Sequence, residues 1–144
     1  MLEITDSPDS PDVKQWSEFV YGHPYGNIFQ TPEMAEVYRR TKNYEPIVLF
    51  GMDGNGEIDA ILLGVIRTER NGLLKSLTSW SMVIGGPLFN DSNICKDILR
   101  NYDQRANKKA VYNEIRMLNN IDILDNILTS QGYFLRIIIM PWSE

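Results

Sequence analysis

Two adjacent glycines followed by a proline form the segment of this sequence with the clearest capacity for chemistry, Gly85-Gly86-Pro87. Glycine adopts backbone angles closed to other residues, and a helix after such a turn offers unpaired N–H groups and a positive dipole end to an anion. We therefore predict that Gly85, Gly86, Pro87 and Leu88 bind a phosphate-bearing ligand, for which an acyl donor is the candidate. The open alternative is a tight turn between strand and helix, since Pro87 has no N–H to offer.

A second group of polar side chains lies on a predicted strand over residues 111–118. Alternation along that strand places Tyr112, Glu114 and Arg116 on one face. In a substrate-binding role, Glu114 would position an amine and Arg116 would hold a phosphate or a carboxylate. The alternative is an ordinary ion pair at the protein surface.

Other reactive or aromatic residues receive structural interpretations. Tyr25, Phe29 and Gln30 lie in a predicted loop, where they either form a substrate-side rim or anchor the loop to the core, and the second role is favoured. His23 has no neighbouring nucleophile or metal ligand in the sequence, and Cys95 lies among apolar residues, so both are predicted to be structural. The sequence identifies no catalytic residue and no metal-binding pattern.

Composition limits the class of protein. The 144 residues fit one domain, and 43% hydrophobic with 23% charged residues is ordinary for a globular protein. The net charge of -5 disfavours nonspecific binding to nucleic acids. No apolar run is long enough to cross a membrane, and the acidic, proline-containing N-terminus does not resemble a secretory signal, so we expect a cytoplasmic protein. A single cysteine excludes an internal disulfide.

Capping signals place the first elements. A short strand is predicted at residues 2–4, followed by a helix over 11–20 with Ser10 as its cap and Trp16 in the core. Thr31 and Pro32 repeat the cap and proline signature for a second helix that ends near Asn43. The turn Asp53-Gly54-Asn55-Gly56 predicts a hairpin rather than a calcium loop, because it lacks the further oxygen ligands that calcium needs.

The remaining chain alternates strands and helices. The hairpin arms are predicted at 46–52 and 58–67, the second apolar enough to be central in a sheet. A strand over 73–84 leads into the double glycine, and Asp91-Ser92 offers a cap for a helix that ends near Lys108. A strand over 111–118, a helix over 120–132 and a last strand over 133–140 complete the order. The sequence therefore predicts an α/β domain with a mixed sheet flanked by helices.

This order of elements resembles the acyl-CoA N-acyltransferase fold, also called GNAT-like. In that fold the fourth strand leads to the third helix through the loop that holds the donor's pyrophosphate, and a cleft opens between the fourth and fifth strands. The resemblance places Gly85-Gly86-Pro87 at this loop. The usual acetyl-CoA loop has Gln or Arg, two residues, Gly, one residue, then Gly or Ala, and this sequence lacks that pattern.

Several short sequence stretches are similar to those of one branch of the superfamily, the Fem-type aminoacyltransferases. The resemblance rests on residues 16–20, 27–33, 85–88 and 114–116 and spans about Trp16 to Gly132. Fem-type enzymes build peptidoglycan bridges from aminoacyl-tRNA and contain two GNAT-like units. The resemblance implies that residues 1–144 correspond to the first unit, with no tightly bound cofactor, an aminoacyl-tRNA or acyl-CoA donor, and a second unit or second copy as partner.

Three functional hypotheses follow. The first is a Fem-like unit that transfers an acyl or aminoacyl group to an amine, incomplete on its own. The second is a noncatalytic binding or pairing module with a GNAT-like fold. The third is a self-sufficient acyl-CoA-dependent N-acetyltransferase with a divergent loop. The sequence does not decide whether the chain is an enzyme.

Overall fold

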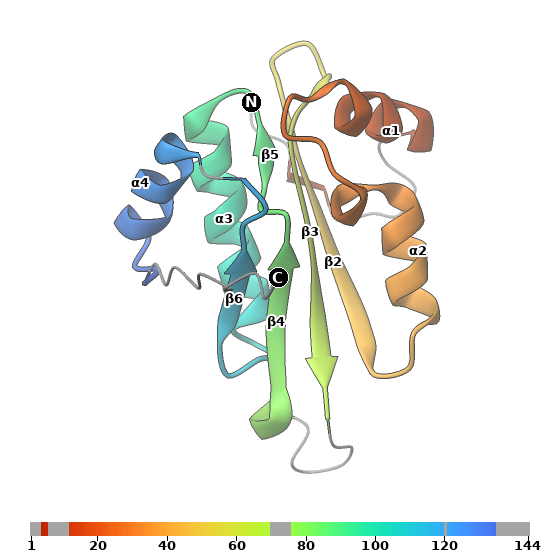
Figure 1. Ribbon diagram of the computed structural model, residues 1–144, viewed down its shortest axis with the longest axis vertical. Coiled ribbons are helices and arrows are strands. Elements are labelled where there is room, and N and C mark those ends of the chain that lie inside the picture. Colours follow the sequence, from red (N-terminus) through yellow and green to blue (C-terminus); the bar gives the residue numbers. More distant parts are fainter. Residues whose placement is uncertain (1–3, 6–11, 70–75, 120, 135–144) are drawn as a thin grey trace, which may run out of the picture.

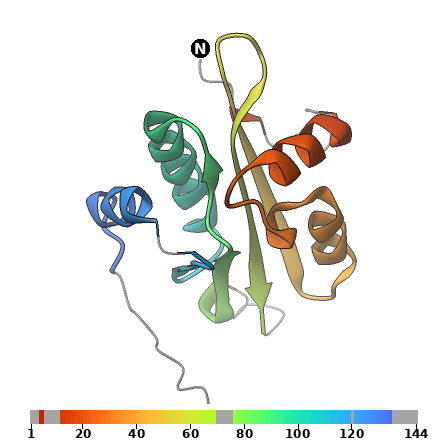
Figure 2. The ribbon, with the colours of Figure 1, turned by 45° about the horizontal axis from the view of Figure 1, so that its top comes forward.

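The computed structural model of the protein describes residues 4–5, 12–69, 76–119 and 121–134. Its helices are α1 (Val13–Gly22), α2 (Pro32–Arg40), α3 (Ser92–Ala106) and α4 (Asp122–Ser130). Its strands are β1 (Ile4–Thr5), β2 (Tyr44–Met52), β3 (Ile58–Thr68), β4 (Ser79–Ile84), β5 (Leu88–Phe89) and β6 (Asn113–Arg116), and two short 3-10 turns are η1 (Ile28–Gln30) and η3 (Ser76–Thr78). The sheet lies between α1 and α2 on one side and α3 and α4 on the other (Figure 1). Figure 2 shows the same two helix pairs from a second direction.

Three helices begin at a side chain that accepts hydrogen bonds from N–H groups of the first turn. Asp12, Thr31 and Asp91 cap α1, α2 and α3 in this way. The predicted caps at Thr31 and Asp91 are confirmed. The prediction of Ser10 as the first cap is wrong, because α1 begins at Val13 and Asp12 supplies the oxygen. Ser10 itself lies outside the described residues.

Strand β3 is the centre of the sheet. It pairs antiparallel with β2, β4 and β5, while β4 pairs parallel with β6 and β1 adds to the far edge of β2. The turn at residues 53–56 joins β2 to β3, and Gly56 has a φ of 81°, so the predicted hairpin is confirmed. The mixed, helix-flanked sheet predicted from the sequence is also confirmed.

Alternate residues of β3 pack against opposite helix layers. Leu63 belongs to the apolar cluster that contains Trp16 of α1, whereas Leu62 belongs to the cluster that contains Leu99 of α3 and Leu124 of α4. Trp16 is only 6% exposed, which confirms its predicted place in the core. The apolar run of β3 is therefore explained by burial on both faces.

The sequence predicted only a turn between Gly85-Gly86-Pro87 and the helix that begins after Asp91, and the structure adds a short strand there. Leu88 and Phe89 form this strand, β5, and they pair with Ile61 and Ala60 of β3 before α3 begins. The physical reason is that the edge of β3 still offers backbone partners there, and Leu88 becomes almost fully buried. The loop between strand and helix is therefore residues 90–91 rather than 85–87.

Other boundaries moved by smaller amounts. Strand β4 begins at Ser79, later than predicted, because residues 76–78 form η3. Strand β6 covers only residues 113–116 of the predicted 111–118. Tyr133 and Phe134 are not in a strand, and the rest of the predicted last strand lies outside the described residues.

Candidate functional site

The parallel strands β4 and β6 separate at the double glycine. Their register ends with Ile84 opposite Arg116, and the Gly85 N–H donates to the Arg116 carbonyl oxygen at 2.8 Å. Because Met82 faces Val65, an uninterrupted ladder would place Pro87 opposite Ala60. Phe89 takes that place instead, so two extra residues interrupt the pairing with β3. We call this interruption at Gly85 and Gly86 the break. After the break, the segment that follows β4 pairs with β3 as β5, whereas the segment that follows β6 runs toward α4.

Both glycines adopt backbone angles that favour glycine, with φ of 84° at Gly85 and 70° at Gly86. A Cβ atom at Gly85 would lie 2.4 Å from Asn27 Oδ1, and one at Gly86 would lie 2.7 Å from Met117 Sδ. These two side chains therefore pack directly on the break. The Gly86 N–H makes no hydrogen bond with any residue in the described ranges. A donor of this kind can stabilise negative charge that develops on an oxygen.

Gln30 fills the gap that the break leaves between β3 and β4. In a regular ladder Leu63 would face Ile84, but the Gln30 side chain lies between their main chains. The Gln30 amide accepts from the Leu63 N–H at 2.7 Å and donates to the carbonyl oxygens of Leu63 and Ile84 at 3.1 and 3.0 Å. The main-chain carbonyl oxygen of Gln30 accepts a hydrogen bond from the Trp16 indole N–H at 2.7 Å. Gln30 is 0% exposed and its side chain anchors the loop to the sheet, so a contact of Gln30 with substrate stays a prediction.

The rest of the loop between α1 and α2 is also held from within. His23 Nδ1 accepts from the Tyr25 N–H, so Nε2 carries the proton and donates to the Phe89 carbonyl oxygen at 3.1 Å. Both nitrogens of the imidazole are thus occupied by main chain, which confirms the predicted structural role. Asn27 caps η1 by accepting from the Phe29 N–H. Phe29 is half-buried and Tyr25 is exposed, so a contact of either with substrate stays a prediction.

Glu114 and Arg116 lie beside the break and face each other on one side of β6. Arg116 donates to both carboxylate oxygens of Glu114, at 2.9 and 3.2 Å. Glu114 raises the pKa of Arg116 through these bonds and through its charge. The surface ion pair considered from the sequence is therefore present. Tyr112 lies just before the strand, where its ring stacks with that of Trp80. It makes no hydrogen bond with the pair, although its charge adds a small part to the raised pKa of Arg116.

The N-terminus of α3 is already occupied by an acidic side chain. Asp91 accepts from the N–H groups of Asn93 and Ile94 at 2.7 and 3.1 Å. These are the donors that an incoming phosphate would use at a helix start. The Asp91 carboxylate takes these hydrogen bonds and adds a negative charge, so the helix start is a poor site for a pyrophosphate.

The structure thus brings together the predicted segment 85–88, Gln30 and the pair Glu114 and Arg116, and it separates Tyr112 from them. Sequence reasoning missed Asn27 and Met117, whose positions depend on contacts between distant segments. In the described part of the chain, no helix is long and apolar enough to cross a membrane. Among those same residues, no group of acidic, histidine or cysteine side chains could hold a metal ion.

Comparisons with known proteins support the fold. No protein-family model matches the sequence, and no curated protein matches it significantly. Several solved structures match along the whole chain, and two of them are aminoglycoside 6'-N-acetyltransferases. The one from Acinetobacter haemolyticus has a TM-score of 0.67 and 13% identity over 99% of this chain and 97% of that one. The one from Acinetobacter baumannii has a TM-score of 0.64 and 13% identity over 100% and 98%. The protein therefore has the GNAT-like acyltransferase fold.

Proposed function

We propose that this protein transfers an acyl or aminoacyl group to an amine at the point where β4 and β6 separate. The observation that carries the proposal is the break at Gly85 and Gly86, with an unpartnered Gly86 N–H among the described residues. In GNAT-like folds the acyl donor lies between these two strands. The Gly86 N–H would then stabilise the charge that develops on the donor's carbonyl oxygen during attack by the amine.

Glu114 and Arg116 supply the acceptor side of the proposed reaction. Their ion pair is exposed to solvent, with side-chain exposures of 37% and 57%, so a ligand can compete for either partner. An incoming ammonium group would replace Arg116 at the Glu114 carboxylate, which would take one of its protons. The neutral amine would then attack the donor's carbonyl carbon, and the departing oxygen or sulfur of the donor would receive a proton. The released Arg116 guanidinium would bind a carboxylate or phosphate of the same ligand.

The proposed donor is not held through a phosphate at α3. Asp91 covers the first N–H groups of that helix, and the loop between Phe89 and Ser92 contains no glycine. This arrangement disfavours the pyrophosphate of coenzyme A and favours the aminoacyl donor that the Fem-type resemblance implies. In that reading the acceptor is an amine of a peptidoglycan precursor, and a second GNAT-like unit or a second copy completes the site.

The test begins with binding of acetyl-CoA to the full chain in a calorimeter. We expect no saturable heat for the wild type, and saturable binding would favour the self-sufficient acetyltransferase. Asp91→Asn keeps a capping oxygen but removes the charge, so it shows whether the charge causes the exclusion. A gain of binding in this variant would support our account of the donor site.

Transfer is then measured with labelled aminoacyl-tRNA and amine acceptors, with the chain alone and with a candidate second unit. We expect Glu114→Gln to lower kcat/KM by about tenfold or more, since it removes the charge that holds the amine. Glu18→Gln, in the exposed pair with Lys14, is the matched control and should have no effect. Absence of transfer with every aminoacyl-tRNA and acyl-CoA donor would favour the noncatalytic module.

A further inference from the structure

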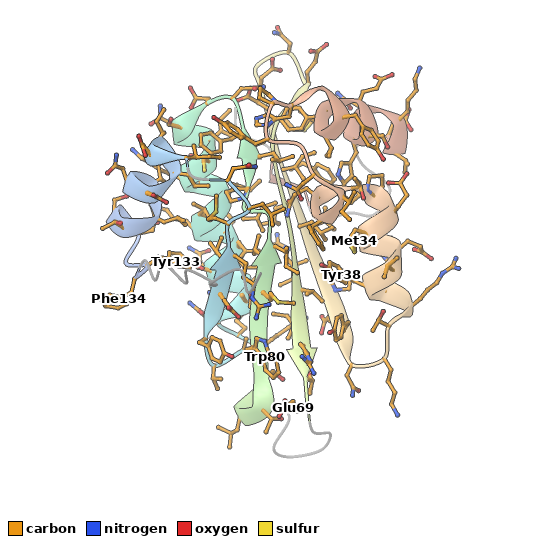
Figure 3. The ribbon with its side chains drawn as sticks, viewed as in Figure 1. Met34, Tyr38, Glu69, Trp80, Tyr133 and Phe134 are labelled. Carbon is orange, nitrogen blue, oxygen red and sulfur yellow. The ribbon has the colours of Figure 1, made fainter. Side chains whose placement is uncertain are left out.

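A row of side chains crosses the sheet at the end opposite the double glycine. Tyr44, Arg67 and Trp80 are direct partners in the registers of β2, β3 and β4. Tyr112, just before β6, extends the row because its ring lies parallel to that of Trp80, at an interplanar angle of 5° and a centroid distance of 6.3 Å. Figure 3 shows Trp80 near the end of the sheet where Glu69 also lies. The row therefore forms a fixed aromatic surface with one cation in it.

The Arg67 guanidinium lies between two aromatic rings. Its Cζ atom is 4.9 Å from the centroid of Trp80 on one neighbouring strand and 6.0 Å from that of Tyr44 on the other. Contacts of this kind hold the guanidinium by its charge against the ring faces and do not use its N–H donors in hydrogen bonds. The rings thus fix the orientation of a fork of donors that can bind both oxygens of an oxyanion.

Arg67 has no acidic partner within the described residues, unlike other arginines of the chain. Arg39 and Arg40 pair with Glu36, and Arg116 pairs with Glu114. Arg67 makes neither an ion pair nor a hydrogen bond through its side chain with any described residue. An exposed guanidinium with its donors unused is ready for an external ligand.

A hollow of about 440 Å³ opens beside this guanidinium. It is lined by Lys42, Asn43, Tyr44, Arg67, Thr68 and Glu69. The charges of Lys42, Arg67 and Glu69 leave one net positive charge in the hollow. One positive charge matches a singly charged carboxylate, whereas Glu69 would repel the second charge of a phosphate.

We propose that the hollow at Arg67 is a binding site for a carboxylate group. The guanidinium binds both carboxylate oxygens, Lys42 adds a second cation, and the exposed edges of the aromatic row contact the rest of the ligand. The site is separate from the double glycine, because the five residue steps from Trp80 to Gly85 span about 16 Å. It does not depend on the proposed transfer reaction, so failure of either proposal leaves the other standing.

The test follows the indole N–H signal of Trp80 by NMR in the full chain. The probes are N-acetylglycine, which carries one carboxylate, its neutral amide, and inorganic phosphate. We expect a saturable shift with N-acetylglycine and none with the amide. Equal shifts with both compounds would overturn the proposal, and tighter binding of phosphate would overturn the assignment to a carboxylate.

Variants separate the site from general charge effects. Arg67→Gln should weaken binding of N-acetylglycine by about tenfold, and Arg67→Lys should also weaken it because the planar fork is lost. Glu69→Gln lies outside the aromatic row and should tighten binding, since it removes the opposing charge. Arg40→Gln, an exposed arginine on α2, is the matched control and should leave the affinity unchanged. Unchanged affinity in all three site variants would contradict the proposal.

Discussion

Replacement of Gln30 by alanine tests how the break in the sheet is held open. The variant loses three hydrogen bonds, to the Leu63 N–H and to the carbonyl oxygens of Leu63 and Ile84. Each lost bond costs about 1 kcal/mol, and a buried main-chain group left without a partner costs about 1–3 kcal/mol. We therefore expect a loss of about 3–5 kcal/mol in the free energy of unfolding. That is a large part of the total of about 5–15 kcal/mol for a typical domain.

The assay is urea denaturation followed by tryptophan fluorescence and circular dichroism. With an m-value of about 2 kcal/mol/M, a loss of 4 kcal/mol lowers the midpoint by about 2 M urea. Gln104→Ala, at an exposed position of α3, is the control and should change the free energy by less than about 0.5 kcal/mol. A cost below about 1 kcal/mol for Gln30→Ala would refute the reasoning, because it would mean that β3 and β4 close and pair with each other.

A pH comparison sharpens the same test. Gln30→Glu keeps the shape of the side chain but places a carboxylate against the carbonyl oxygens of Leu63 and Ile84. The folded state then favours the protonated carboxyl and raises its pKa above the value of about 4.3 for an unfolded chain. The stability of this variant relative to wild type should be highest below that pH and should fall as the pH rises through the folded-state pKa. A stability difference independent of pH would contradict the proposed contacts.

Two further predictions concern the glycine break and the buried thiol. Gly86→Ala should lower the free energy of unfolding by about 1–2 kcal/mol, because φ is 70° and the new methyl group would lie 2.7 Å from Met117 Sδ. Gly54→Ala, where a Cβ meets nothing within 4 Å, is the control in the same urea assay. Equal losses in the two variants would disprove the reasoning. Burial raises the pKa of Cys95 to about 12, so a thiol-specific disulfide reagent at mildly alkaline pH should react slowly with the folded protein and rapidly after denaturation. Rapid labelling of the folded protein would show that the thiol is accessible.

The sequence was sufficient to predict features that depend on local interactions. The turn at residues 53–56 sets the register of β2 and β3, and the apolar run of β3 marks it as central. The caps at Thr31 and Asp91 act within one helical turn, so they can be read without knowledge of the fold. These local signals explain why the order of most elements could be predicted.

The break at the double glycine could not be predicted correctly because its outcome depends on distant partners. Two glycines and a proline are compatible with a turn into a helix or with an interruption inside a strand. The free edge of β3 decides between them, since it pairs with Leu88 and Phe89. The same limit applies to Arg67, whose aromatic neighbours come from two other strands.

The contacts at the break also connect two sequence motifs that lie more than fifty positions apart in the chain. Gln30 binds the carbonyl oxygen of Ile84, and the Asn27 side chain covers Gly85 where any Cβ would collide with it. Residues 27–33 and 85–88 are two of the four short stretches on which the Fem-type resemblance rests. A physical reason therefore exists for them to occur together. A strand interrupted by two glycines leaves main-chain groups of Leu63 and Ile84 unpaired, and the Gln30 amide from the loop before α2 satisfies them. Residues 27–33 and 85–88 thus form one structural unit, which sets the position of the Gly86 N–H on which the proposed chemistry depends.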